Sequence, residues 1–245
     1  MRTELICGAF FSPPLVYWSE SAGCSGPFPR IVVQLAAHAG FTTKFQHIGH
    51  YQLAHFDETN FDLALAIFDS PRRSYMGMVE GAVAEVAVQA AGPLGQNHRA
   101  DDKSLTTILD SNRRIVVKEG DIGHDVVLAQ GAEWLQRVTV EPATSNRDLA
   151  ELLSDPGIDF VISDALTLTS IMTSPHSSGM ARRLVFSKPT CWLTLGVLVS
   201  HDSPYSPEAF RADWANNSLL RERQHLYDVL ETYGTAVLRP PPGLP

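Results

Sequence analysis

The sequence lacks an excess of basic residues, and this absence excludes a broad class of functions. Its 245 residues include 19 Lys and Arg against 27 Asp and Glu, which gives a formal net charge of -8. A nucleic-acid-binding protein needs a basic face to replace the counterions on phosphates. We therefore predict no nucleic-acid partner. The net charge does not restrict small ligands, because their sites depend on local charge.

A long apolar run is also missing. A membrane-spanning helix needs about 20 predominantly apolar residues, and no segment of this sequence approaches that length. The apolar stretch in residues 1–18 is short and runs straight into Pro13-Pro14, which is not the pattern of a signal peptide. We expect no direct insertion into a membrane, and without a signal peptide a cytoplasmic location stays an alternative.

Motifs for metals and disulfides are scarce. The three cysteines allow at most one internal disulfide and have no metal-site spacing; they are Cys7, Cys24 and Cys191. Three histidines lie close together in the sequence, but their spacings of three and five do not place them on one helix face; they are His47, His50 and His55. We predict free thiols, no metal site and no cofactor.

What the sequence does contain is the pattern of an α/β protein. Hydrophobic residues make up 44% of the chain, which is enough for a packed core. The length suits one large domain or two lobes of roughly 100 to 130 residues each. The apolar patterns predict strands at 3–10, 42–48, 63–68, 114–118, 137–141, 158–162 and 192–200, and helices at 31–40, 105–109, 125–134, 145–153 and 206–233.

The stretch 61–76 is the most informative part of the chain. An apolar run at 63–68 has the composition of a strand buried on both faces. It stops at an Asp-Ser-Pro sequence, which favours the start of a helix, and Arg72 and Arg73 follow. In open α/β sheets small ligands bind at the carboxyl ends of the strands. The two arginines are therefore candidates for ligand binding, and the alternative is that they lie on a solvated first turn.

Two other strand ends follow a similar pattern. The strand at 114–118 opens onto a glycine-containing turn at 119–124, and the next helix could receive a carboxylate or phosphate at its N-terminus. This turn is not a Walker motif, because the Gly-Lys-Ser/Thr sequence is missing. The strand at 158–162 ends at Ser163-Asp164. Asp164 is either an N-cap or a ligand contact, and the sequence leaves both alternatives open.

The order of these segments resembles the bacterial extracellular solute-binding proteins of family 3, the periplasmic binding proteins for amino acids and related small polar solutes. The matching motifs are SPPLVYW at 12–18, GPFPRIVVQLAAHAG at 26–40, DLALAIFDSPRR at 62–73, VVKEGDIG at 116–123, GIDFVISD at 157–164 and LYDVLETYG at 226–234. The resemblance implies a two-lobe type II fold, in which each lobe is a mainly parallel sheet flanked by helices. Lobe 1 would hold residues 1–87 plus 192–245, and lobe 2 residues 88–191, with hinge crossings near 84–90 and 187–191.

The resemblance also implies a ligand site without catalytic residues. Arg73 would pair with a ligand carboxylate through a planar two-pronged hydrogen bond. Asp164 would accept from the ligand ammonium, and the helix that starts at 121–122 would offer its amides to the carboxylate. Asp69 would partly neutralise Arg73 or select an amine-bearing ligand. The ligand-binding residues implied in this way are Phe11, Tyr17, Trp18, Asp69, Ser70, Arg73, Gly120, Asp121, Ile122 and Asp164.

By the same resemblance, the function would be that of the substrate-binding component of an ABC-type uptake system. The protein would be a monomer, periplasmic or extracellular, with a small-molecule ligand and an ABC permease as partners. One alternative is a ligand-sensing or orphan binding domain without a transport role. Another is an enzyme that resembles cyclohexadienyl dehydratases, for which His124 or Glu119 would be the candidate general acid.

Overall fold

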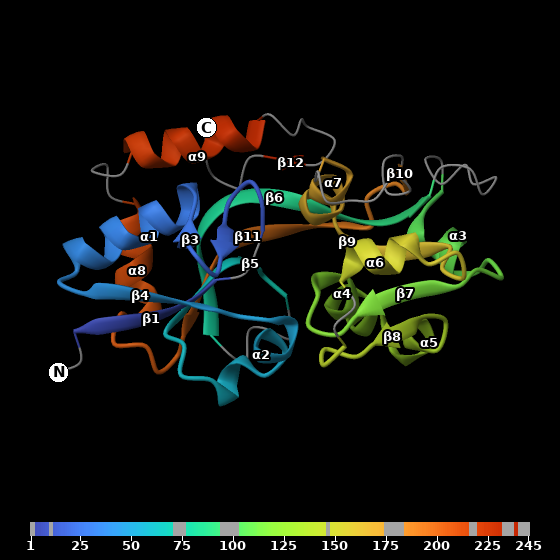
Figure 1. Cartoon of the computed structure of the whole chain (residues 1–245), viewed down its shortest axis with the longest axis horizontal. Coiled ribbons are helices and arrows are strands. Elements are labelled where there is room, and N and C mark those ends of the chain that lie inside the picture. The colour runs from blue at the N-terminus through green and yellow to red at the C-terminus, as the bar shows by residue number, and fades with distance from the viewer. Residues whose placement is uncertain are drawn as a thin grey trace. The chain divides into compact units, whose positions relative to one another are not determined.

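The computed structural model describes residues 3–9, 12–70, 77–93, 103–145, 148–173, 184–215, 220–231 and 238–239 (Figure 1). The chain divides into two compact units. Unit 1 comprises Met1–Glu85 with Leu193–Pro245, and unit 2 comprises Val86–Trp192. Two strands, β6 (Gly77–Pro93) and β11 (Cys191–Ser200), carry the chain from one unit to the other. Within the described part of the chain, no helix is long and apolar enough to cross a bilayer.

Unit 1 is a mixed sheet with helices packed on it. Its elements are β1 (Glu4–Ala9), β2 (Tyr17–Ser19), β3 (Gly23–Ser25), α1 (Pro27–His38), β4 (Thr42–His47), α2 (His50–Ala54), the 3-10 turn η1 (Phe56–Glu58), β5 (Leu63–Phe68), α8 (Pro207–Ala215), α9 (Leu220–Glu231) and β12 (Leu238–Arg239). The strand order is β4-β1-β5-β11. β1 is parallel to both of its neighbours, and β11 is antiparallel to β5. In Figure 1, α1, α8 and α9 lie together on one side of this sheet.

Helix α1 begins four residues earlier than the predicted helix at 31–40. Its first turn contains Pro27, which is tolerated there because the first amides of a helix have no intrahelical partner. Gly26 precedes it with φ of 123°, and a Cβ at this position would clash with the carbonyl oxygen of Leu15. The amide of Phe28 donates to the same Leu15 oxygen at 3.2 Å. The glycine therefore permits the tight connection that starts the helix.

Strand β5 is fully buried and contains a bulge. In its pairing with β11, Leu65 lies opposite Val197 and Ile67 opposite Gly196, so Ala66 is an extra residue. Ala66 has φ of 57°, in the left-handed region that non-glycine residues rarely adopt. The bulge interrupts the alternation of faces expected from a regular strand.

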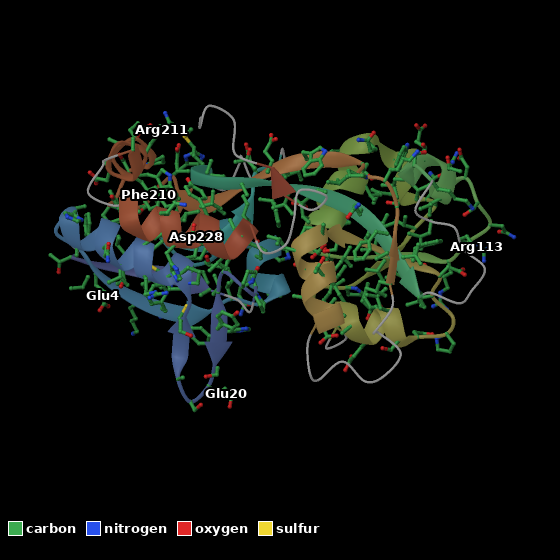
Figure 2. All side chains as sticks on the ribbon, turned by 90° about the horizontal axis from the view of Figure 1, so that it is seen from above. Glu4, Glu20, Arg113, Phe210, Arg211 and Asp228 are labelled. Carbon is green, nitrogen blue, oxygen red and sulfur yellow. The ribbon has the colours of Figure 1, made fainter. Side chains whose placement is uncertain are left out.

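The strand β6 is linked to helix α8 by a charged pair. Glu80 is buried, and its carboxylate accepts from Arg211 Nε at 2.8 Å and from Nη2 at 2.5 Å. This two-pronged geometry satisfies both carboxylate oxygens. Phe210 and Arg211, both labelled in Figure 2, are consecutive residues of α8. Phe210 is fully buried in the aromatic packing of unit 1.

Unit 2 repeats the strand order of unit 1. Its elements besides β6 are α3 (Leu105–Leu109), β7 (Ile115–Lys118), α4 (Ile122–Gln130), α5 (Ala132–Leu135), β8 (Thr139–Glu141), α6 (Leu149–Ser154), β9 (Phe160–Asp164), α7 (Ala165–Thr173) and β10 (Leu184–Phe186). The order is β8-β7-β9-β6, with β7 parallel to β8 and β9, and with β6 antiparallel to β9. β10 pairs with the far end of β6. One core lies between the sheet and α6 and α7, where Val116, Val161, Leu152 and Leu168 pack together.

Besides α1, three predicted helices differ from the structure. The helix at 125–134 is two helices, α4 and α5, because Gly131 between them has φ of 122°. The helix predicted at 145–153 begins only after Asp148, whose side chain accepts from the amide of Glu151 at 2.8 Å, so the predicted start at residue 145 is wrong. The helix at 206–233 is α8 and α9, with 216–219 outside the described residues. The helix expected after Ser70 falls on 71–76, also outside the described residues, and β6 begins at Gly77.

All three cysteines are free thiols, as predicted. Cys7 lies in the central strand of unit 1 and is fully buried. Burial raises the pKa of its thiol far above the ordinary value, and the nearby charge of Asp62 acts in the same direction. Partial burial also raises the pKa of Cys24, to about 11. Both thiols are therefore protonated at neutral pH and react slowly.

Candidate functional site

The candidate site is the carboxyl edge of the sheet in unit 2. Strands β7 and β9 are parallel neighbours, with Val116 opposite Val161. β7 leads through residues 119–121 into α4, and β9 leads directly into α7. Two helix N-termini therefore arise from adjacent strand ends. This is the part of an open α/β sheet where ligands bind, because backbone amides and polar loop residues converge there.

Asp121 is the N-cap of α4 and is only 8% exposed. Its Oδ1 atom accepts from the amide of Gly123 at 2.9 Å. The hydroxyl of Ser163, near the end of β9, donates to Oδ1 at 2.9 Å and lies 3.1 Å from Oδ2. The carboxylate thus joins the start of α4 to the end of the neighbouring strand.

Glycine makes this approach of α4 to β9 possible. A Cβ on Gly123 would overlap the backbone carbonyl of Ile162. Gly120, in the turn after β7, has φ of 83°, which a residue with a side chain adopts only with strain. Gly120 is therefore explained by its positive φ, and Gly123 by its close contact with the backbone of β9. Ile122 is buried at the first position of the helix.

Asp164 ends β9 and is almost completely buried, with 2% of its surface exposed. Its Oδ1 atom accepts from the amide of Thr167 at 2.9 Å, in the first turn of α7. Burial raises the pKa of its carboxyl to about 6, and the charge of Asp121 adds to this shift. Hydrogen bonds from Thr167 and Leu166 act in the opposite direction. The N-cap alternative for Asp164 is therefore confirmed, and its contact with a ligand stays a prediction.

Sequence reasoning missed two polar residues at this edge. Lys118 is buried at the end of β7, and its ammonium donates to the carbonyl oxygen of Ser145 at 3.1 Å. Burial lowers the pKa of this ammonium. The charges that oppose the shift are those of Glu141, Asp148, Asp121 and Glu151. The second polar residue that sequence reasoning missed is Ser163, whose hydroxyl donates to Asp121. A Lys or Ser at the end of an apolar run was the available signal, but a sequence does not show which way such side chains point.

Glu119, a candidate acid for the dehydratase alternative, also lies in the turn after β7. Its Oε2 atom accepts from the amide of Ala143 at 3.1 Å, so this carboxylate supports the loop that follows β8. His124 lies in the first turn of α4, where its amide donates to the carbonyl of Asp121 at 3.2 Å. Among the described residues, no group of three or more His, Cys, Asp and Glu side chains is arranged to hold a metal ion.

The residues predicted from unit 1 are more scattered. Tyr17 and Trp18 lie on β2, which pairs with β3 in a separate hairpin, and Figure 2 shows Glu20 at its tip. Tyr17 is 43% exposed, and the Trp18 ring lies 5.6 Å from the ring of His47. Asp69 and Ser70 follow β5. Two of the predicted ligand contacts, Phe11 and Arg73, lie outside the described residues.

Similarity to known proteins is found in the structure of the chain and not in its sequence. No family model and no curated protein matches the sequence. Solved structures do match over nearly the whole chain. A histidine kinase sensor domain with similarity to periplasmic binding proteins shares 14% identity with a TM-score of 0.74, covering 98% of this chain and 99% of that chain. The chain has the type II periplasmic-binding-protein fold. The predicted fold class is confirmed.

Two further structures show how the same periplasmic-binding-protein fold is used elsewhere. A mutant of ArgBP from T. maritima shares 15% identity at a TM-score of 0.70, covering 94% of this chain and 95% of that one. A putative L-cystine ABC transporter from Listeria monocytogenes shares 12% identity at a TM-score of 0.71, covering 97% of this chain and 98% of that one. At these identities the likeness establishes the fold. The predicted resemblance to amino-acid-binding proteins is confirmed at that level.

Proposed function

We propose that this protein binds a small polar solute that carries an amine, an amino acid or a related compound, and that the carboxyl edge of unit 2 forms part of the site. The observation that carries this proposal is Asp164. Its carboxylate is buried at a strand end, where its charge is disfavoured. A ligand ammonium beside it would compensate that charge. Asp121, a second carboxylate that is close enough to raise the pKa of Asp164, strengthens the preference for an amine.

Other structures that match this chain support a ligand of this class. One is Tv2483 bound to L-arginine, and another is the AvGluR1 ligand binding domain in complex with serine. Each of these ligands carries an α-ammonium group. We propose that Arg73, with Phe11, Tyr17, Trp18, Asp69 and Ser70 of unit 1, contributes to the same site, and that Arg73 pairs with a carboxylate when the ligand has one.

For the biological role, we propose the substrate-binding component of an ABC-type uptake system. The match to a putative ABC transporter protein supports this role. A ligand-sensing role is the second candidate, and the match to a histidine kinase sensor domain favours it. The two roles share the binding step, so the experiment below tests what both require. Pull-down of a permease or measurement of kinase control would then separate them.

The test is a thermal-shift screen with amino acids, polyamines and small carboxylates. A ligand present at 100 times its dissociation constant should stabilise the protein by about 2.7 kcal/mol. We expect Asp164→Asn and Arg73→Ala to remove most of the shift caused by an amino acid, each measured against its own ligand-free baseline. Asp159→Asn is the matched control, because Asp159 lies at the opposite, amino end of β9 and accepts from the amide of Arg114 at 2.9 Å.

Three outcomes would each contradict a different part of the proposal. If no solute shifts the melting temperature of the wild-type protein, the binding function is wrong. If hits are found and survive Asp164→Asn unchanged, binding occurs but the carboxyl edge of unit 2 is not part of the site. Hits that survive Arg73→Ala would remove only the predicted carboxylate contact from unit 1.

A further inference from the structure

The N-terminus of α4 already holds a negative charge of its own. The N-terminus of a helix attracts anions, because its first amides lack intrahelical partners and carry a partial charge equivalent to roughly +0.5. Here the Asp121 carboxylate accepts from the amide of Gly123 at 2.9 Å. A full unit of negative charge exceeds the partial positive charge of the helix end. A ligand carboxylate in this position would therefore be repelled.

Three groups near Asp121, those of Ser163, Asp164 and Lys118, do not reverse this charge balance. The hydroxyl of Ser163 donates to Asp121, so its single hydrogen is already used. Asp164, at the end of the adjacent strand, is a second buried acid. Lys118 is the cation at this edge within the described residues, and its ammonium donates to the carbonyl of Ser145 while four acids attract it. An anionic ligand group would add a further negative charge to buried acids that already disfavour one another.

We propose that Asp121 is a specificity-determining residue, which makes this end of the site select a ligand amine or guanidinium and reject a ligand carboxylate. The inference rests on the proposed function, since it concerns the ligand class of the same site. It replaces the expectation that the amides of α4 receive the ligand carboxylate. It also implies that a ligand needs no carboxylate at all in order to bind at this edge.

A series of four-carbon solutes tests this charge preference at constant chain length: putrescine, 4-aminobutyrate and succinate. Arginine and agmatine form a second pair that differs in the carboxylate. By calorimetric titration of the wild-type protein, we expect putrescine or agmatine to bind and succinate to bind at least tenfold more weakly. Asp121→Asn should weaken the binding of the amines at least tenfold, because it removes a charge from a desolvated site. The same change should reduce the ratio between the dissociation constants of succinate and of the amines.

Two features make the variant informative. Asparagine retains the side-chain oxygen that accepts from Gly123 and Ser163, so the fold of this edge should persist, and the melting temperature verifies it. The matched control is Asp155→Asn. Asp155 accepts from the amide of Gly157 at 2.8 Å, in the same Asp-x-Gly arrangement, but it precedes β9 and lies at the amino end of the strand. We expect Asp155→Asn to leave the ligand preference unchanged.

Each other outcome has a distinct meaning. If succinate binds better than the amines, or if Asp121→Asn leaves their ratio unchanged, this inference is wrong and the binding function stands. If Asp155→Asn alters the ratio as much as Asp121→Asn does, the effect is one of general charge, and the assignment to Asp121 is wrong. If no solute of any charge binds, the proposed function fails and this inference fails with it.

Discussion

Strands β5 and β9 hold equivalent positions in the two units, and both are preceded by an aspartate that ties them to a parallel neighbour. Asp62 Oδ2 accepts from the amide of Ile6 at 2.7 Å, within β1. Asp159 Oδ2 accepts from the amide of Arg114 at 2.9 Å, just before β7. The aspartates that precede β5 and β9 therefore have the same structural role. Each accepts a hydrogen bond from a backbone amide in, or just before, the parallel neighbouring strand.

The aspartates at the other end of the two strands, Asp69 and Asp164, differ in their exposure to solvent; we call them the trailing acids. Asp69 after β5 is exposed, and its amide donates to the carbonyl of Thr194 at 2.8 Å. Asp164 at the end of β9 is buried, and it caps a helix that begins at the next residue. β5 also contains the bulge at Ala66. One sequence pattern therefore leads to a solvated acid in unit 1 and to a buried acid that caps a helix in unit 2.

The largest effect is expected from the close approach of α4 to β9. Gly123→Ala places a methyl group on the carbonyl of Ile162, and backbone atoms cannot move aside as side chains do, so we expect a destabilisation of about 2 to 3 kcal/mol. In Gly8→Ala, in β1 beside β5, the new Cβ would meet only side-chain atoms of Ile48 and Phe61 at 3.2 and 3.3 Å. We expect less than about 1 kcal/mol for this variant. Urea unfolding measures the stability of both variants, and an equal loss of stability in the two would contradict the predicted difference between them.

A smaller effect, of opposite sign, is expected from Asp164→Asn. Burial raises the pKa of Asp164 from 3.8 to about 6, so between these values the folded state holds a proton that the unfolded state has released. Stability due to this group therefore falls as pH rises from about 4 to about 6, and the loss is complete above pH 6. Asparagine stays neutral and can still cap α7. In the absence of ligand, the variant should be more stable than wild type at pH 7.5, on the order of 2 kcal/mol, and equal to it near pH 4.

Asp69→Asn serves as the control for this prediction. Asp69 is exposed, so the same substitution should change stability by less than about 0.5 kcal/mol at either pH. Urea unfolding of the three proteins at pH 4 and pH 7.5 gives the comparison. An Asp164→Asn variant that is less stable than wild type at pH 7.5 would mean that the charged carboxylate is favourable in the folded protein. The contrast between the two trailing acids would then be lost.

The smallest effect concerns the bulge in β5. Ala66→Gly removes the strain of a left-handed residue with a side chain, about 1–2 kcal/mol. The gain is partly offset because glycine is more flexible in the unfolded chain. We expect a net stabilisation of about 0.5–1 kcal/mol. Ala64→Gly, in the same buried strand, has no strain to relieve and should destabilise by about 1 kcal/mol. Midpoints of urea unfolding decide the sign, and a loss at both positions would contradict the assignment of strain to Ala66.

Much of the fold follows from the sequence because its signals are local. A buried strand such as β5 appears as an unbroken apolar run. The division into two lobes was implied by the resemblance to the family 3 solute-binding proteins, because the chain length alone also allowed one large domain. Helix ends were harder. The segment from Ser145 to Asp148 contains several residues able to cap a helix, and in the structure the cap is Asp148. Gly131 divides α4 from α5 through its positive φ. A glycine in a sequence permits a positive φ but does not require one.

The candidate site was predictable in outline. Asp121 and Asp164 each follow an apolar run, and the carboxyl ends of parallel strands meet at one edge. The hydroxyl of Ser163 reaching Asp121 was not predictable, because it depends on the register of β7 and β9 and on the closeness of α4. Nor was the burial of Lys118, since a lysine at a strand end is ordinarily solvated.

The buried thiol of Cys7 has a practical consequence. Its side chain lies in the central strand of unit 1, and a reagent reaches it only when that unit opens. Cys191, half-buried in β11, belongs to unit 2. Because Cys191 is partly exposed, its alkylation does not require unit 2 to open. The rate at which Cys7 is alkylated, measured by peptide mass spectrometry against Cys191 as the reference, therefore reports the opening of unit 1 without an added label or a substituted residue.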